Sequence, residues 1–255
     1  MSELAIYPSL KEKIVFVTGG ATGIGASIVE HFAAQGARVA FFDVDGPAAE
    51  KLMADIATRG QAQPHFYRSD VRDIPNFRLK IQEARQDLGD PGVLVNNAAR
   101  DDRHSIDSVT PEYWDERIAV NLRHQFFATQ AVMDGMKRLG GGSIINLGSG
   151  SWRSASGGMP VYLTAKAGVE GLTRGLARDL GPFNIRVNCV IPGWVMTERQ
   201  IKLWLTPDAE VNLMRQQCLK KRLMAEDIAR MVMWLAAADS GMATAQAFVV
   251  DAGLH

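Results

Sequence analysis

The amino-acid sequence predicts an α/β protein, a single domain over residues 1–255 with a doubly wound parallel sheet of seven strands flanked by helices. Short runs of β-branched and aromatic residues alternate with longer helical patterns along most of the chain. Most of these short runs are continuously apolar, as expected for strands that helices cover on both faces. No linker-like change of composition, internal repeat or low-complexity tract divides the chain. Such alternation predicts parallel strands joined by right-handed crossovers.

Each predicted element follows from its local pattern. The predicted strands are residues 14–18, 39–43, 65–69, 93–96, 143–147, 186–190 and 247–250. The predicted helices are residues 25–35, 47–59, 74–88, 111–139, 161–180 and 225–237. Pro47 and Pro111 stand where a helix begins, a position at which the missing N–H of proline costs nothing.

Composition excludes several classes of protein. Lysine plus arginine and aspartate plus glutamate each number 28, so the formal net charge is +0 and we expect no binding to nucleic acid or to an anionic membrane. Cys189 and Cys218 form no disulfide framework, which predicts a cytoplasmic protein. The chain from Met1 has no leader pattern, and no uncharged stretch approaches the ~18 residues of a membrane span. The histidines have no metal-ligand spacing, so no metal site is predicted.

A glycine-rich segment, TGGATGIG at residues 18–25, joins the first strand to the first helix. Gly19, Gly23 and Gly25 allow a sharp turn and a close approach of the backbone to a pyrophosphate. The helix that follows presents free N–H groups and the positive end of its dipole. A glycine-rich loop can be an ordinary tight turn, but this strand–turn–helix context favours a Rossmann-type dinucleotide site. No Gly-Lys-Ser/Thr follows, which excludes a nucleotide-hydrolysing P-loop.

Asp43, at the end of the second predicted strand, indicates which dinucleotide binds. A carboxylate there accepts hydrogen bonds from the adenosine ribose hydroxyls and repels a 2′-phosphate. Arg38 begins the same strand, and we expect it at the far end, where it cannot pair with a phosphate. The sequence therefore favours NAD over NADP. The alternative is that Asp43 is only an acid in a surface turn.

Polar and small residues also follow the third and fourth predicted strands. Asp70 and Val71 are positioned to offer an acceptor and an apolar cover to the adenine. Asn97 stands at the end of the fourth strand, before Ala98 and Ala99, which leave room for a ribose. Strand-end loops often contain Asp and Asn for turn formation alone, but ligands of open α/β sheets bind at these carboxyl ends.

Tyr162 and Lys166 are four residues apart on a predicted helix, and Ser149 precedes Tyr162 by thirteen residues. Positions i and i+4 share one helix face, so the phenol and the ammonium can enter one pocket. The lysine cation would favour the phenolate and lower the tyrosine pKa towards the range useful for general acid–base catalysis. Ser149 would hold the reacting oxygen. On an arbitrary helix the pair would be a packed tyrosine and a solvated lysine.

Together these residues resemble the short-chain dehydrogenase/reductase family over essentially the whole chain. The matching features are TGGATGIG at 18–25, NNAA at 96–99, Asn121, Ser149, Tyr162 with Lys166, and Pro192-Gly193 followed by Thr197. One departure is Ala99, where the family usually has glycine; the added methyl group is a modest change.

The resemblance implies a role for each matching residue. Tyr162 would be the catalytic acid/base, Ser149 would orient the substrate oxygen, and Asn121 would anchor a water in the proton relay. Lys166 would lower the tyrosine pKa and hold the nicotinamide ribose. Thr197 would bind the carboxamide beside Val195, and Thr22 and Ile24 of the glycine motif belong to the cofactor site. The family also implies a homotetramer, which small residues along the helix after Tyr162 would allow.

Within the family the chain is most similar to bacterial NAD-dependent sugar dehydrogenases of the D-xylose 1-dehydrogenase type. The resemblance implies oxidation of an aldose, a pentose such as D-xylose or L-arabinose, at C1 to the lactone. Trp152, Trp194 and Trp204 would offer flat faces to a sugar ring, or belong to the core or an interface. The segment Ile201–Leu205 would form a lid.

Two alternatives remain open. Arg153, between Ser149 and Tyr162, would bind a substrate carboxylate through paired hydrogen bonds. This interpretation favours a second activity, the oxidation of a secondary hydroxyl of a 2-keto-3-deoxy sugar acid. Arg153 could equally be an exposed or intersubunit arginine. A redox sensor that binds NAD without catalysis belongs to another class. The complete set of Ser149, Tyr162, Lys166 and Asn121 disfavours it.

Overall fold

A computed structural model describes residues 5–254, so the expectations that rest on the first four residues and on His255 lie outside the described residues. Seven parallel strands form one sheet in the order β3-β2-β1-β4-β5-β6-β7, which confirms the predicted fold class. The strands are β1 (Ile14–Thr18), β2 (Arg38–Asp43), β3 (His65–Arg68), β4 (Val93–Asn96), β5 (Gly142–Leu147), β6 (Ile185–Pro192) and β7 (Ala247–Val250). The order reverses between β1 and β4, so a crevice is expected outside the carboxyl ends of these two strands.

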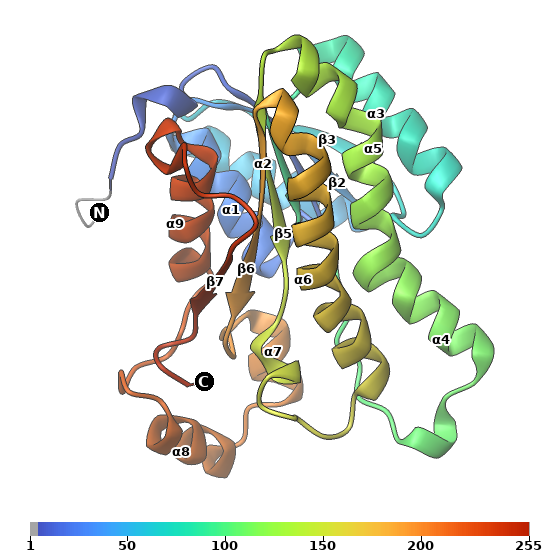
Figure 1. Cartoon of the computed structure of the whole chain (residues 1–255). Helices are drawn as coiled ribbons and strands as arrows, with labels where there is room; N and C mark the ends of the chain where they lie inside the picture. The colour runs from blue at the N-terminus through green and yellow to red at the C-terminus, as the bar shows by residue number, and fades with distance from the viewer. Residues whose placement is uncertain (1–4, 255) are drawn as a thin grey trace.

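Helices cover both faces of the sheet (Figure 1). The helices are α1 (Gly23–Ala34), α2 (Gly46–Thr58), α3 (Ile74–Leu88), α4 (Pro111–Ile118), α5 (His124–Arg138), α6 (Pro160–Leu180), α7 (Glu198–Leu203), α8 (Pro207–Gln216) and α9 (Ala225–Ala236). One layer contains α1, α2 and α9, and the other contains α3, α5 and α6. Helices α7 and α8 lie apart from both layers, beyond the carboxyl ends of the strands.

Alternation along the strands divides the core between the two layers. Val15 and Val17 of β1 belong to the core under α1, α2 and α9, together with Phe32. Phe16 points to the other face, where it packs edge-on against Phe42 in the core under α3 and α5. All of these side chains are fully buried. The central strands are therefore apolar on both faces, and polar residues are concentrated at the strand ends.

One predicted helix is wrong in a way that bears on the site. Residues 111–139 form two helices, α4 and α5, joined by a π-helical turn over Ala119–Arg123. A π turn leaves the helical pattern of apolar residues almost unchanged, so periodicity alone does not reveal it. The turn contains Asn121, and π turns inside helices are frequent at functional sites. The other predicted helices and strands all overlap observed ones.

Two short helices between β6 and α9 are missing from the prediction. The side chain of Thr206 accepts a hydrogen bond from the Ala209 amide at the start of α8, and Pro207 follows Thr206. This is the same signal that marks α4 at Thr110 and Pro111, so α8 could have been recognised from the sequence.

Two searches cover the described residues. No helix within residues 5–254 is long and apolar enough to cross a membrane. The same range contains no cluster of three His, Cys, Asp or Glu side chains with the arrangement of a metal site.

Candidate active site

The glycine loop after β1 is held by backbone contacts that exclude side chains. Gly19 adopts φ +66°, and a Cβ there would lie 2.7 Å from the Ala98 Cα. A Cβ at Gly25 would lie 1.8 Å from the Gly19 carbonyl oxygen, so no other residue fits. Gly23 also has a positive φ, +57°. These positions make a tight cradle of backbone, as the sequence predicts.

The cradle opens onto the start of α1. Thr22 is the N-cap residue of α1, but its side chain makes no capping hydrogen bond in the described structure. The first N–H groups of α1 therefore remain available to an anion, and the helix dipole adds positive potential there. This combination fits the pyrophosphate of a dinucleotide. Gly19, Thr22, Ile24 and Gly25 line a crevice of about 320 Å³ at this edge.

The far end of that crevice carries the carboxylate of Asp43. Asp43 is half-buried at the end of β2, where it accepts hydrogen bonds from the amides of Ala21 at 2.9 Å and Val44 at 2.7 Å. These bonds fix the carboxylate at the mouth of the crevice. Arg38 begins β2, at the opposite end of the strand, as expected. The position of Asp43 suits ribose hydroxyls.

Asp70 and Val71 line the same crevice, but Asp70 has a partner that the sequence analysis did not foresee. Arg72 binds the Asp70 carboxylate, with Nη2 2.6 Å from Oδ2, and also pairs with Glu116 at 2.6 Å. Its hydrogen bonds hold the pKa of Asp70 below the usual value. The acceptor capacity of Asp70 is thus shared with Arg72, while buried Val71 remains an apolar wall.

Asn97 acts on the glycine loop. Its Nδ2 donates to the carbonyl oxygens of Gly19 at 2.8 Å and Thr18 at 3.1 Å, and its backbone N–H donates to the Thr18 hydroxyl at 3.0 Å. These bonds tie the end of β4 to the end of β1. Asn97 also lines both the crevice and the larger cavity beside it.

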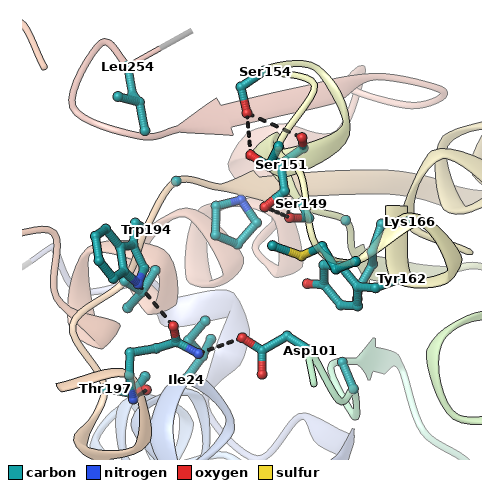
Figure 2. A pocket seen from close by; sticks show the side chains of 18 of the residues that line it. Ile24, Asp101, Ser149, Ser151, Ser154, Tyr162, Lys166, Trp194, Thr197 and Leu254 are labelled. Atoms are coloured by element: carbon teal, nitrogen blue, oxygen red, sulfur yellow. Dashed lines mark hydrogen bonds between the residues drawn. The ribbon is translucent and has the colours of Figure 1, made fainter. Parts of the chain in front are cut away.

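The larger cavity brings together three of the four residues expected to be catalytic. It has a volume of about 600 Å³, and Ser149, Tyr162 and Lys166 all line it. Figure 2 shows them on one side, with Trp194 and Thr197 opposite. Ile24, Asn97, Ala99 and Thr197 line both this cavity and the crevice, so the two spaces adjoin. A dinucleotide held by the glycine loop would therefore extend towards Tyr162.

The electrostatics of Tyr162 and Lys166 differ from the expectation. Burial raises the pKa of Tyr162 to about 12, although a hydrogen bond with Ser149 lowers it. Burial lowers the pKa of Lys166 to about 8. Lys166 Nζ lies 5.8 Å from the centre of the Tyr162 ring and donates to the Leu147 carbonyl at 2.7 Å. Desolvation opposes the charged form of both groups, so the protein alone does not lower the tyrosine pKa as the sequence analysis expects.

Asn121, the fourth expected residue, does not line the cavity. It is fully buried in the π turn, and its Oδ1 accepts from the Arg100 amide at 2.9 Å. Its Nδ2 donates to the carbonyls of Arg100 at 3.1 Å and Arg117 at 2.9 Å. The side chain of Asn121 thus fixes the loop after β4 to the π turn.

Residues after β6 line the cavity, but Ile201–Leu205, the segment expected to form a lid, is absent from the lining. Val195 and Thr197 both line the cavity, and Thr197 is the N-cap of α7. Gln200 of α7 accepts a hydrogen bond from Trp194 Nε1 at 2.9 Å and donates to Asp101 Oδ2 at 2.6 Å. Asp101 follows β4, so Gln200 joins the segment after β6 to the loop after β4; Figure 2 shows Asp101 and Trp194 at the two ends of this bridge.

Asp101 and Gln200 are site residues that the sequence reasoning missed. Asp101 belongs to Asp101-Asp102-Arg103-His104, a charged run directly after NNAA, and that position was the available signal. No sequence pattern indicates that Gln200 meets Asp101, because the two are 99 residues apart.

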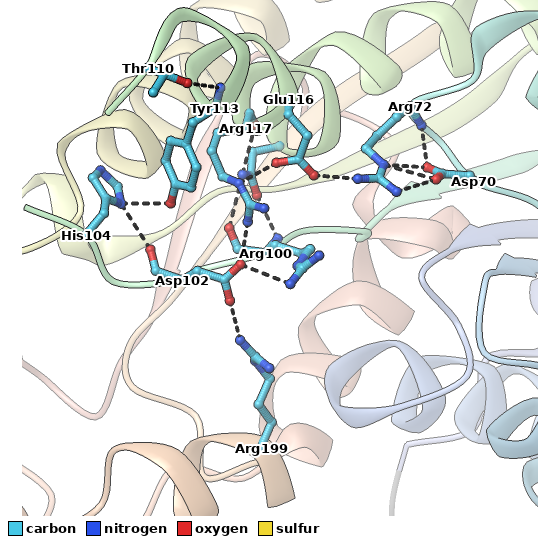
Figure 3. A network of polar contacts seen from close by, with 11 residues as sticks. Asp70, Arg72, Arg100, Asp102, His104, Thr110, Tyr113, Glu116, Arg117 and Arg199 are labelled. Carbon is cyan, nitrogen blue, oxygen red and sulfur yellow. Dashed lines mark hydrogen bonds and ion pairs between the residues drawn. The ribbon is translucent and has the colours of Figure 1, made fainter. Parts of the chain in front are cut away.

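A second polar network anchors the same loop (Figure 3). Asp102 forms ion pairs with Arg100 at 3.1 Å, Arg117 at 2.6 Å and Arg199 at 2.6 Å. Burial raises the pKa of Asp102, but the three arginines outweigh this effect and hold it below the usual value. Arg199 belongs to α7, so this network also ties that helix to the loop after β4.

The structure gives Arg153 another partner than the expected substrate carboxylate. Its guanidinium pairs with Glu170 at 2.8 Å and lies 5.4 Å from the centre of the Trp152 ring. Arg153 is absent from the cavity lining, which contains Arg103 instead. Arg153 lies between Ser149 and Tyr162 in the sequence, and this location gave no sign that its side chain pairs with Glu170 of α6. Of the three tryptophans considered, Trp194 lines the cavity, whereas Trp152 and Trp204 do not.

Comparisons with known proteins agree with this geometry. A family model described as enoyl-(acyl carrier protein) reductase matches residues 19–255. D-xylose 1-dehydrogenase of Caulobacter vibrioides is 49% identical over 250 residues, which cover 98% of each chain. The probable galactose dehydrogenase GalD of Rhizobium meliloti is 47% identical over 248 residues, 97% of each chain.

A solved structure also resembles the chain. A 3-oxoacyl-[acyl-carrier protein] reductase from Brucella melitensis with bound NAD is similar with a TM-score of 0.89 at 26% identity, covering 100% of this chain and 97% of that one.

Proposed function

Because the chain belongs to the short-chain dehydrogenase/reductase family, we propose that it is an NAD-dependent dehydrogenase that oxidises an aldose, such as D-xylose or L-arabinose, at C1 to the lactone. The observation that carries this proposal is the convergence of Ser149, Tyr162 and Lys166 on a cavity that adjoins the crevice beside the glycine loop. Sugar dehydrogenases are its curated relatives at 47% and 49% identity.

Each residue of the site is proposed to have a separate role in the reaction. Bound NAD supplies the hydride acceptor and a positive charge. The phenolate of Tyr162 removes the proton from the sugar hydroxyl, while Ser149 donates a hydrogen bond to the same oxygen. Burial raises the pKa of Tyr162, and the charges of Lys166 and of bound NAD would have to stabilise the phenolate against this effect. Thr197 and Val195 are proposed to hold the carboxamide end of the nicotinamide, and Asn121 to anchor a proton-relay water.

The lining of the cavity suits a polyhydroxylated ligand. Asp101, Ser151, Ser154 and Asn212 provide hydrogen-bonding groups, and Trp194 provides a flat apolar wall. Sugars present hydroxyl groups at the ring edge and C–H groups on the ring faces, so such a mixed lining matches both.

NAD rather than NADP is the proposed cofactor because the carboxylate of Asp43, which lines the crevice at the end of β2, would repel a 2′-phosphate. Arg72 and Arg100 also line the crevice, but both are engaged in ion pairs: Arg72 with Asp70 and Glu116, and Arg100 with Asp102, which Arg117 and Arg199 share. We expect Asp43→Ala to narrow the preference for NAD over NADP at least about tenfold, since removal of one like charge is worth 1–2 kcal/mol.

A substrate screen tests the proposal. NADH formation is followed spectrophotometrically over pentoses, hexoses and sugar acids, and the lactone is identified as the product. Turnover of an aldose with lactone formation supports the proposal. NAD binding with no turnover on any alcohol would instead favour an NAD-binding sensor.

A second substrate class, the 2-keto-3-deoxy sugar acids, is favoured by one observation. Arg103 lines the cavity, its charge lowers the pKa of Tyr162, and it forms no ion pair within the described range. Its Nη1 contacts Met159 Sδ at 2.8 Å. A guanidinium in that position can bind a carboxylate. Arg103→Ala separates the two candidates, because selective loss of activity on the acid supports the second.

We also propose that the protein is a homotetramer of the cytoplasm. Side chains placed at Gly171 and Gly175 of α6 would meet nothing within 4 Å, so this face can admit a close partner helix. Phe126 of α5 is exposed on the neighbouring helix. Light scattering of the purified protein tests the assembly, and a monomer would contradict it. Both cysteines are free, in agreement with a reducing compartment.

A further inference from the structure

Helix α6, which carries Tyr162, begins without a capping side chain of its own. Its N-cap residue is Met159, whose side chain makes no capping hydrogen bond, and Pro160 at the first helical position has no N–H. Val161 therefore contributes the first backbone N–H of the helix, and no carbonyl of the helix accepts it. Val161 is 1% exposed and Met159 3% exposed, so this end of the helix is shielded from bulk water. The amide of Val161 needs a partner from another segment.

That partner is the imidazole of His104. The Val161 N–H donates to His104 Nε2, with 3.3 Å between the two nitrogen atoms. His104 is half-buried in the loop after β4, 57 residues before Val161. Its ring nitrogen thus has the role that the side-chain oxygen of Ser, Thr, Asp or Asn has at many helix starts.

Further contacts fix the ring of His104 (Figure 3). Its Nδ1 lies 3.0 Å from the Tyr113 hydroxyl of α4 and 3.2 Å from the Asp102 carbonyl oxygen. The Tyr113 ring packs edge-on to the imidazole, with 5.1 Å between the ring centres. A backbone N–H only donates, so Nε2, which faces Val161, carries no proton, and Nδ1 carries the proton of the neutral ring. The imidazole is therefore held in the tautomer in which Nε2 accepts.

The bond at Val161 reaches the active site through one peptide unit. Tyr162 directly follows Val161, and its side chain lines the cavity beside Ser149. The Leu163 N–H donates to the Met159 carbonyl at 3.1 Å, so Tyr162 lies inside the first turn of α6. His104 fixes the start of the turn from which the Tyr162 side chain enters the cavity.

We propose that His104 is a positioning residue for Tyr162: it caps α6 from the loop after β4 and thereby sets the position of the Tyr162 hydroxyl in the cavity. This inference rests on the proposed dehydrogenase function, in which Tyr162 removes the substrate proton. His104 does not line the cavity, and no bond is formed or broken at its ring. Proton transfer requires the acceptor at a defined distance from the substrate hydroxyl, so a small displacement of Tyr162 lowers kcat more than it raises KM.

The first experiment measures the cap itself and needs no sugar. Hydrogen exchange of the Val161 amide is followed by NMR in the protein without substrate. We expect His104→Leu to accelerate this exchange at least about tenfold, since leucine has a similar size and no acceptor. His104→Gln, which retains an acceptor oxygen, restores part of the protection. His31→Leu is the matched control, because it removes another half-buried histidine whose ring bonds a carbonyl, that of Ser27, and it leaves the exchange at Val161 unchanged.

Kinetics then measure the effect on Tyr162. We expect His104→Leu to lower kcat about tenfold, with NAD affinity and the KM of the sugar within about twofold of the wild-type values, and His104→Gln to recover part of kcat. The backbone N–H of His104 donates to the Gly158 carbonyl at 2.8 Å, an attachment of the loop after β4 that does not depend on the side chain. A higher KM with unchanged kcat would show that His104 only orders this loop, and would overturn the proposal.

Unchanged exchange at Val161 in folded His104→Leu, or an equal change in His31→Leu, would also overturn it. If His104→Leu does not fold, the ¹⁵N resonances of the His104 ring in the wild-type protein decide. An unprotonated Nε2 in the neutral ring supports the cap, and a protonated Nε2 overturns it. Accelerated exchange at Val161 in His104→Leu, in a protein that turns over no alcohol, would contradict only the proposed dehydrogenase function.

Discussion

The two halves of the cleft are built in different ways. The half that would hold the adenosine and pyrophosphate is made largely of backbone: glycine positions with no room for a Cβ, an uncapped helix end and amide groups bonded to Asp43. The half beside Tyr162 is made of side chains that arrive from separate segments, with Gln200 joining Trp194 to Asp101. The first half is constrained by covalent geometry, whereas the second can change with single side chains.

The largest effect is expected in the backbone half. In Gly25→Ala the new methyl group would lie 1.8 Å from the Gly19 carbonyl, so the loop must move. We expect NAD affinity to fall at least about 100-fold, since the phosphate cradle depends on that loop. Isothermal titration calorimetry measures the affinity. Gly171→Ala, where nothing lies within 4 Å, is the matched control and keeps normal affinity. Equal affinity in both variants would show that the loop tolerates a side chain.

Lys166 provides a test of the side-chain half through stability. Its pKa is lowered to about 8, so the folded state releases a proton that the unfolded chain keeps until about pH 10.5. The charged amine therefore destabilises the fold below pH 8, and this penalty of about 3 kcal/mol disappears as the pH rises from 8 to 10.5. Relative to Lys166→Met, the wild-type protein should gain stability over that range. Chemical denaturation at several pH values measures this, and parallel curves would contradict the burial of a charged lysine.

Replacement of Gln200 tests whether the segment after β6 and the loop after β4 act together in binding the sugar. We expect Gln200→Ala to raise KM for the sugar about tenfold, because Trp194 and Asp101 lose a shared partner, and to leave NAD affinity nearly unchanged. Steady-state kinetics with a sugar identified by the screen gives both parameters. Loss of NAD affinity instead would place Gln200 in the cofactor half.

The boundary between predictable and unpredictable parts of the molecule follows the same division. The strand and helix periods, the glycine loop, Asp43 and the i, i+4 pair of Tyr162 and Lys166 are local patterns, and the structure places these residues at one edge of the sheet. The bridge through Gln200 depends on residues 99 apart, so no local pattern reveals it.

Electrostatics set a further limit on prediction. The spacing of Tyr162 and Lys166 indicates that they face one pocket, but only the structure reveals how strongly burial opposes their charges. The same holds for Arg153, whose partner Glu170 is seventeen residues away on α6.

The smallest effect is expected at Arg153. Its pair with Glu170 lies near the surface, and such pairs contribute about 0–1 kcal/mol. Arg153→Ala should therefore leave kcat and KM on aldoses and sugar acids within about twofold of the wild-type values. A selective loss of activity on a sugar acid would return Arg153 to the substrate site.

The most direct test of the catalytic assignment is Tyr162→Phe, measured for NAD affinity and for kcat on the best substrate of the screen. Removal of the hydroxyl leaves the ring in place, so NAD affinity should stay within about twofold, while kcat should fall at least about 100-fold because the proton acceptor is lost. Turnover near the wild-type rate with normal NAD binding would contradict the role of Tyr162 as the catalytic acid/base.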